Sequence, residues 1–191
     1  MSSISSVGYF LVANLFSFAF FILWARLFIR YFSVGTFHPF SQSIYTLTAP
    51  IIAPIQKNIT RNRGTQSRYD FACLILLVFC ELFKFTTINV LFLSSSLSLN
   101  YVLMYSIVDM VVQPCNILFY AIIIRSLMSW LNPHWQHPFA SLLFLVTEPS
   151  LRAIRRVLPN VGMIDLSPIV VILVLKSIEI VASSLLPQLS L

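Results

Sequence analysis

Four long apolar stretches with few charged residues dominate this sequence and restrict the folds open to it. They cover residues 8–32, 69–93, 102–131 and 167–186. A helix needs roughly 20 residues to cross the hydrocarbon core of a bilayer, and each stretch reaches that length. The sequence therefore predicts an all-α integral membrane protein with four transmembrane helices.

The composition supports lipid as the main solvent of this chain. Hydrophobic residues make up 58% of its 191 residues and charged residues only 9%, whereas soluble domains carry about 25% charged residues. The sequence contains no Walker loop, H-E-x-x-H motif or catalytic triad pattern. We therefore expect a protein that is not an enzyme.

Basic residues gather in two of the connections, 33–68 and 132–166, and none lies in the 94–101 connection. By the positive-inside rule, both basic loops face the cytoplasm and both termini face outward. Because these residues lie beside apolar runs, anionic lipid is the expected partner, and nucleic acid is not. The predicted headgroup-binding residues are Lys57, Arg61, Arg63, Arg152, Arg155 and Arg156.

An internal repeat appears when residues 26–55 are compared with residues 125–154, at an offset of 99. Seven of the thirty positions are identical without a gap: Arg26/Arg125, His38/His137, Pro39/Pro138, Phe40/Phe139, Thr48/Thr147, Pro50/Pro149 and Ile55/Ile154. Both copies start on the same side of the membrane, so a parallel repeat with a pseudo-two-fold axis along the membrane normal is expected. The first copy covers residues 1–93 and the second covers 102–191.

Each loop is expected to contain a short amphipathic helix at the membrane surface. In the second copy this helix is predicted from Ser150 to Pro159, with Pro149 suited to a first helical turn. The ten-residue stretch before Pro50 in the first copy, and before Pro149 in the second, is too short to span the bilayer. Each stretch forms either an interfacial segment or a re-entrant turn.

Several of these segments resemble the YggT family, named YlmG in other bacteria and in plastids. The resemblance is carried by Arg125-Ser-Leu-Met-Ser-Trp-Leu-Asn-Pro133, Thr147-Glu-Pro-Ser-Leu-Arg-Ala-Ile-Arg-Arg-Val-Leu-Pro159 and Asp165-Leu-Ser-Pro168. The first copy departs from this pattern at Thr48-Ala-Pro50. The resemblance implies a small inner-membrane or thylakoid protein without a known catalytic activity. Relatives are associated with osmotic-stress tolerance, with cell-division or nucleoid organisation, and with assembly of a b-type cytochrome in plastids.

Charged residues within the apolar stretches are candidates for function. Glu81 lies eleven residues after Asp70, about 16 Å along a helix and so near the bilayer midplane. Lys176 follows Asp165 by the same spacing, and Lys84 and Glu179 lie three residues further on in each copy. The copies thus place opposite charges at equal depth.

We expect Glu81 to face Lys176, and Lys84 to face Glu179. A lone charge at this depth costs about 2.5–3.5 kcal/mol on insertion scales. One interpretation is a neutral clamp that fixes helix register. The other is a proton or cation pathway.

A second group of charges lies where the helices meet the basic loops. Arg26 and Arg125 end the first and third stretches, and Asp70 and Asp165 begin the second and fourth. An ion pair within each copy, Arg26 with Asp70 and Arg125 with Asp165, would close each unit. The alternative is that the arginines contact lipid phosphate.

No metal site or cofactor is expected. The histidines His38, His134 and His137 lie in loops without a nearby cysteine or carboxylate in sequence. We therefore expect a membrane scaffold or assembly factor that binds partner membrane proteins, or a second copy of itself, and anionic lipid. The alternative is a small ion-transport or osmotic-response component that uses the paired intramembrane charges.

Overall fold

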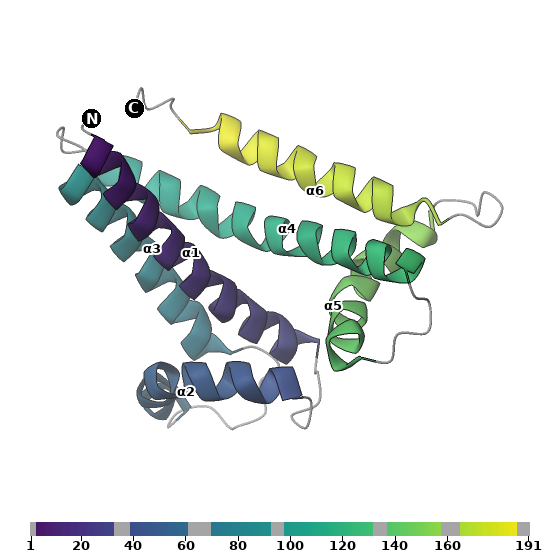
Figure 1. Ribbon diagram of the computed structural model, residues 1–191. Coiled ribbons are helices and arrows are strands. Elements are labelled where there is room, and N and C mark those ends of the chain that lie inside the picture. Colours follow the sequence, from purple (N-terminus) through teal and green to yellow (C-terminus); the bar gives the residue numbers. More distant parts are fainter. Residues whose placement is uncertain are drawn as a thin grey trace. The chain divides into compact units, whose positions relative to one another are not determined.

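The computed structural model describes residues 3–32, 39–60, 70–92, 98–131, 137–157 and 165–186. These residues form six α-helices (Figure 1). In chain order the helices are α1 (Ser3–Tyr31), α2 (Pro39–Thr60), α3 (Phe71–Phe92), α4 (Leu99–Leu131), α5 (Pro138–Arg155) and α6 (Ser167–Ser184).

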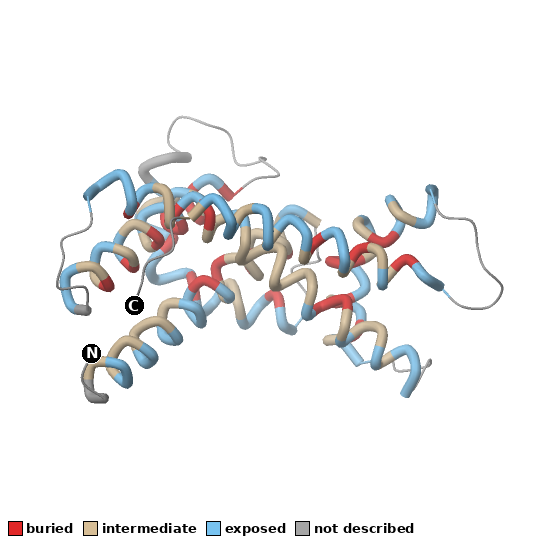
Figure 2. Tube along the Cα trace, turned by 90° about the horizontal axis from the view of Figure 1, so that it is seen from above, coloured by how far each residue is buried: buried red, intermediate tan, exposed pale blue. Residues whose placement is uncertain are grey.

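Four of the six helices are long and apolar enough to cross a membrane: α1, α3, α4 and α6. Their apolar segments are Ser5–Tyr31, Phe71–Leu91, Leu99–Leu131 and Ser167–Ser184, within a few residues of the predicted stretches. Exposed positions recur along the helices of the chain (Figure 2), and all four of these helices contain them. Large apolar side chains such as Leu15, Phe79 and Val90 are exposed there. A membrane protein covers such side chains with lipid, and the chain is accordingly a membrane protein.

The helices group into two compact units. The first comprises residues 1–31 and 43–110, and α1 packs against α3 within it. Figure 1 shows α2 lying across the ends of these two helices. The apolar core of this first unit comprises Phe20, Leu23, Ile52, Ala72, Cys73, Leu76 and Leu77.

The second unit comprises residues 32–42 and 111–191, so α4 contributes to both units. Here α5 packs against α6 near the end of α4 (Figure 1). The core comprises Ile122, Leu151, Val171 and Leu175. Ile122 and Leu151 lie 99 residues after Leu23 and Ile52 of the first core, so the two cores use corresponding positions.

The loop helices are longer than the sequence suggested. We expected a short helix to begin at Pro149, but α5 is continuous from Pro138, and α2 likewise continues through Pro50 and Pro54. A proline inside a helix removes one backbone hydrogen bond to the carbonyl four residues earlier. All three prolines are exposed, so each helix tolerates the loss on its outer side. The segment before Pro149 is therefore helical.

Candidate functional site

A buried arginine joins the three helices of the first unit. The Nε atom of Arg26, on α1, donates a hydrogen bond to Asp70 Oδ2 at 3.0 Å, and Nη1 donates to the Thr48 hydroxyl at 2.5 Å. The guanidinium lies 4.8 Å from the ring centroid of Tyr45. Arg26 and Asp70 are only 5% and 3% exposed. Arg26 therefore connects α1 to α2 and to Asp70, the residue that precedes α3. Its pairing with Asp70 is the pair that the sequence predicted.

The second unit holds an arginine in a similar way. Arg125 Nη1 donates to the Thr147 hydroxyl at 2.8 Å, and Nη2 donates to Glu148 Oε2 at 2.7 Å. The guanidinium lies 4.2 Å from the ring centroid of Phe144. The arginine, the aromatic residue and the threonine each lie 99 residues after their counterparts in the first unit. Only the source of the carboxylate differs.

The predicted pair between Arg125 and Asp165 was wrong. In the structure Arg125 pairs with Glu148, and Asp165 Oδ2 lies 2.6 Å from Arg155 Nη2. The position after the shared threonine is Ala49 in the first copy and Glu148 in the second. The second copy therefore supplies a carboxylate from α5 itself, one residue from the threonine, and Asp165 pairs elsewhere.

The two carboxylates at this end of the second unit have lowered pKa values. Partial burial raises the pKa of Glu148, but its hydrogen bond to Arg125 and the nearby arginine charges outweigh that effect and bring the pKa below its usual range. Partial burial likewise raises the pKa of Asp165, and the hydrogen bonds from Arg155 and Ser167 outweigh it. Both residues lie outside the membrane-spanning segments. Both carboxylates therefore remain ionised at neutral pH.

We expect the second unit to lose stability in acid through Glu148. A carboxylate with a lowered folded-state pKa stabilises the fold above its ordinary pKa, and the contribution is lost as the pH falls through the folded value. Melting temperatures measured in detergent from pH 7 to pH 3 should fall less steeply for Glu148→Gln than for the wild type. Equal slopes for the two proteins would contradict this assignment.

A cluster of charges lies within the helices of the first unit. Lys84 Nζ lies 3.5 Å from Glu81 Oε2 on the same helix and also pairs with Asp109 of α4. The ammonium faces the ring of Phe20 at 5.1 Å from its centroid. Glu81 is fully buried and Lys84 is 7% exposed. Charges this deep are stable only when paired, and here protein groups provide the pairing.

Asp109 was not among the residues predicted for this cluster. The predicted depth of each charge was counted from the start of its own helix, which does not relate α3 to α4. Counting from their shared 94–101 connection would have found it. Lys84 lies eight residues before the end of α3 and Asp109 ten residues after the start of α4. Two antiparallel helices joined by a short connection bring such positions to similar depth.

The second unit has its own charged cluster. Lys176 Nζ, on α6, lies 2.6 Å from Glu179 Oε2 and donates to Asn116 Oδ1 of α4 at 3.1 Å. It also faces the ring of Phe119, the counterpart of Phe20 in the first unit, at 4.3 Å from the centroid. The side chains of Lys176 and Glu179 are 37% and 27% exposed. This cluster is thus more open than that of the first unit.

The partners described for these four predicted charges lie within their own units. The predicted pairs of Glu81 with Lys176, and of Lys84 with Glu179, would join the two units. These pairs stay a prediction. Within each unit, the i,i+3 pair on one helix is supplemented by a polar residue of α4.

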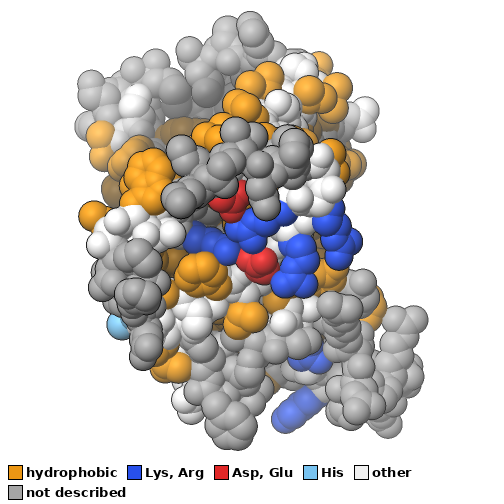
Figure 3. Space-filling model, turned by 90° about the vertical axis from the view of Figure 1, so that its right-hand side faces the viewer, with side chains coloured by type: hydrophobic (Ala, Val, Ile, Leu, Met, Phe, Trp, Pro, Cys, Tyr) orange, Lys and Arg blue, Asp and Glu red, His pale blue; other side chains and the backbone are white. Residues whose placement is uncertain are grey.

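The predicted headgroup-binding residues occupy the loop helices where they are described. Lys57 is exposed on α2, and Arg61 and Arg63 lie outside the described residues. Arg152, Arg155 and Arg156 are exposed at the end of α5. Basic and acidic side chains gather together on the face shown in Figure 3.

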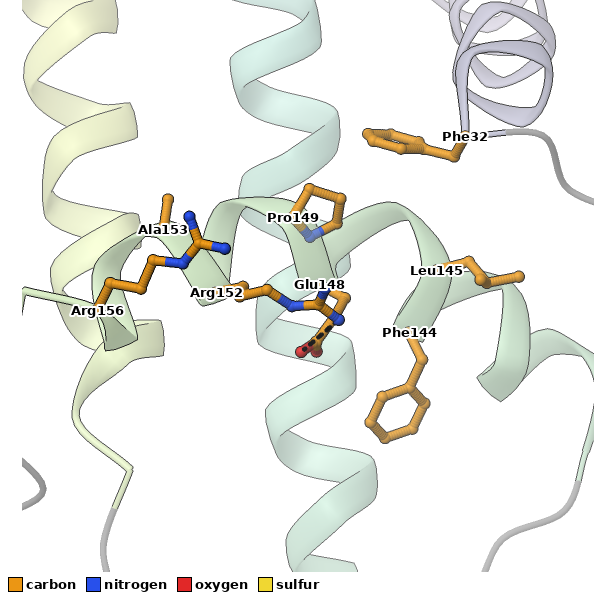
Figure 4. Close-up of a pocket in the computed structure, with 8 residues that line it drawn as sticks. All are labelled: Phe32, Phe144, Leu145, Glu148, Pro149, Arg152, Ala153 and Arg156. Atoms are coloured by element: carbon orange, nitrogen blue, oxygen red, sulfur yellow. Dashed lines mark ion pairs between the residues drawn. The ribbon is translucent and has the colours of Figure 1, made fainter.

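A pocket of about 620 Å³ lies beside α5 (Figure 4). It combines apolar side chains with two arginines and one carboxylate. The lining residues are Phe32, Phe144, Leu145, Glu148, Pro149, Arg152, Ala153 and Arg156. Its volume falls within the range of roughly 300–1,000 Å³ that is typical of small-molecule sites.

Among the described residues, no three His, Cys, Asp or Glu side chains come close enough together to hold a metal ion. His137 precedes α5, and its Nδ1 accepts a hydrogen bond from the backbone N–H of Phe139 at 3.2 Å. It therefore caps the helix. His38 and His134 lie outside the described residues.

The sequence itself is similar to a protein family and to several uncharacterised bacterial proteins. The family model described as CCB3/YggT matches residues 5–91 and 103–186. An uncharacterised protein of Pseudomonas aeruginosa is 27% identical over 180 residues, 94% of this chain and 89% of its own length. The uncharacterised protein YggT of Escherichia coli strain K12 is 25% identical over 158 residues, which is 83% of this chain and 79% of that protein. No solved structure matches the chain significantly.

Proposed function

Since this chain belongs to the CCB3/YggT family, whose relatives described above carry no named activity, we propose that it is a non-enzymatic membrane scaffold or assembly factor. It would bind partner membrane proteins, or a second copy of itself, through its helices. Its basic loops would bind anionic lipid.

The main support is the buried ion pair at the centre of the first unit's charged cluster. Glu81 is fully buried, and Lys84 lies against Glu81, Asp109 and an aromatic ring. A conduction path needs charged groups that water or ions reach. None of the residues that line the α5 pocket belongs to either charged cluster. A buried ion pair favours a clamp that holds helices in register.

We further propose that the two halves are parallel copies, residues 1–93 and 102–191, in a bacterial inner membrane. The two arginine contacts support this, since Arg26 with Thr48 and Arg125 with Thr147 are separated by the same 22 residues. The basic loops would then lie in the cytoplasm, with both termini outside, and α2 and α5 at the membrane surface.

The alternative function is ion transport, and one observation favours it. Lys176 and Glu179 are partly exposed on a helix that is apolar enough to cross the membrane. Such a pair is expected to face a polar cavity or a protein partner, because lipid does not solvate it well. The two functions therefore make different predictions for the same pair.

Two measurements on the full-length protein separate these functions. Chemical cross-linking in native membranes, followed by purification in mild detergent, should recover a defined membrane-protein partner or a second copy of the chain. Reconstituted vesicles should show no proton or potassium flux above protein-free vesicles. Flux that disappears in Lys176→Met/Glu179→Gln, which keeps the net charge of the pair at zero, would establish the transport alternative and reject the scaffold.

A further inference from the structure

The α5 pocket carries two arginines whose donors are not used up within the structure described. Arg152 and Arg156 lie one helical turn apart and both line the pocket. Arg152 approaches Glu148 only at 3.8 Å. Glu148 also accepts a shorter hydrogen bond, 2.7 Å, from Arg125. A guanidinium has five N–H donors, so donors remain for a ligand.

The third arginine of this segment, Arg155, is used differently. It lies 3.2 Å from Glu148 and 2.6 Å from Asp165, and it does not line the pocket. The pocket itself contains two positive charges and one negative charge, a net charge of +1. It is therefore complementary to a singly charged anion.

Apolar side chains form the other part of the lining. Phe32, Phe144 and Leu145 lie along one side of the pocket, with Pro149 between them and the arginines (Figure 4). A free phosphate or other small soluble anion would leave these side chains uncovered. A ligand that joins an anionic group to a hydrocarbon chain would cover both parts.

The position of α5 relative to the spans of its own unit narrows the ligand class. Arg125, six residues before the end of α4, hydrogen-bonds to Thr147 and Glu148 of α5. Asp165, two residues before α6, pairs with Arg155 near the end of α5. The helix is thus fixed where two membrane-spanning helices end, which is the depth of lipid headgroups.

We propose that this pocket binds one anionic glycerophospholipid, with its phosphate between Arg152 and Arg156 and an acyl chain along Phe32, Phe144 and Leu145. This deepens the lipid binding of the proposed function, because it replaces a diffuse basic surface by a defined site in the second copy. The first copy has Ala53 and Lys57 at the two arginine positions, so it lacks half of the charge.

Native mass spectrometry of the full-length protein in detergent, titrated with dioleoyl phosphatidylglycerol or dioleoyl phosphatidylcholine, tests this site. Wild-type protein should retain one phosphatidylglycerol in preference to phosphatidylcholine. Arg152→Gln and Arg156→Gln should each weaken that binding about ten-fold, since each removes a charge-assisted hydrogen bond. Lys57→Gln is the matched comparison: it removes the same charge at the position equivalent to Arg156, outside the pocket, and should weaken binding of the retained phosphatidylglycerol less than about two-fold, far less than either arginine variant.

The apolar part of the site has its own test. Leu145→Ser should weaken the binding of dioleoyl phosphatidylglycerol without changing the binding of glycerol 1-phosphate. If glycerol 1-phosphate competes as well as the whole lipid, the site is a phosphate site only and the lipid proposal is rejected. If Lys57→Gln weakens binding as much as the two arginine variants, the pocket is rejected and only general lipid attraction remains. If the wild type shows no preference for phosphatidylglycerol, the anionic-lipid part of the proposed function fails as well, while the scaffold role is tested separately by cross-linking.

Discussion

Asp70→Asn is expected to lower the free energy of unfolding by about 3–5 kcal/mol, as is typical when one partner of a buried ion pair is removed. The substitution leaves the buried Arg26 guanidinium without its carboxylate, 3.0 Å away, and weakens the junction of α1, α2 and α3. Reversible unfolding of the purified protein in mixed micelles of mild detergent and SDS would measure the change.

The matched control is the corresponding aspartate of the second copy. Asp165 is 42% exposed and pairs with Arg155, which is itself 36% exposed. Asp165→Asn should therefore cost only about 0–1 kcal/mol, as exposed pairs do. Equal losses of stability in the two variants would contradict the structural difference between the buried pair of Asp70 and the exposed pair of Asp165.

The second large effect is expected from Lys84→Met. This change leaves the buried Glu81 and the partly buried Asp109 without the cation that lies between them. We expect a loss of about 3–5 kcal/mol in the same unfolding assay. Adding Glu81→Gln and Asp109→Asn should recover most of it, because the triple variant leaves no uncompensated charge. A triple variant as unstable as Lys84→Met alone would show that the cluster is not held together by charge.

Lys84→Met, in the same unfolding assay, also tests the predicted pairing between the two copies. If Lys84 faces Glu179, the variants Lys84→Met and Glu179→Gln should be coupled by more than about 0.5 kcal/mol in a double-mutant cycle. Additive effects would leave each cluster paired only within its own unit.

The sequence predicted the parts of the fold that depend on a single segment. Long apolar runs specify membrane-spanning helices because lipid provides no partner for an unsatisfied backbone. The pair of Arg26 with Asp70 was also predictable, because the connection places both residues at the same end of their helices. Choices between competing partners were harder. Arg125 had two carboxylates within reach, and whether it pairs with Glu148 or Asp165 depends on how α5 docks, which periodicity does not show.

Proline had a similar effect on the loop helices. Pro149 was expected in a first helical turn, which is the usual position of proline, and Pro50 is its counterpart in the first copy. Both occur within continuous helices, and both are exposed. Whether a proline ends a helix depends on the environment of the carbonyl it releases, and that environment is set by tertiary structure.

The helix α4 has a consequence for how such a protein is assembled during synthesis. The predicted boundary between the two copies lies in the 94–101 connection, yet Asp109, beyond that boundary, pairs with Lys84 before it. A ribosome that has released only residues 1–93 has therefore produced a segment in which Lys84 has its Glu81 partner but not Asp109. That contact forms only when the next hydrophobic segment enters the bilayer, so a helix from beyond the predicted first copy completes the first unit.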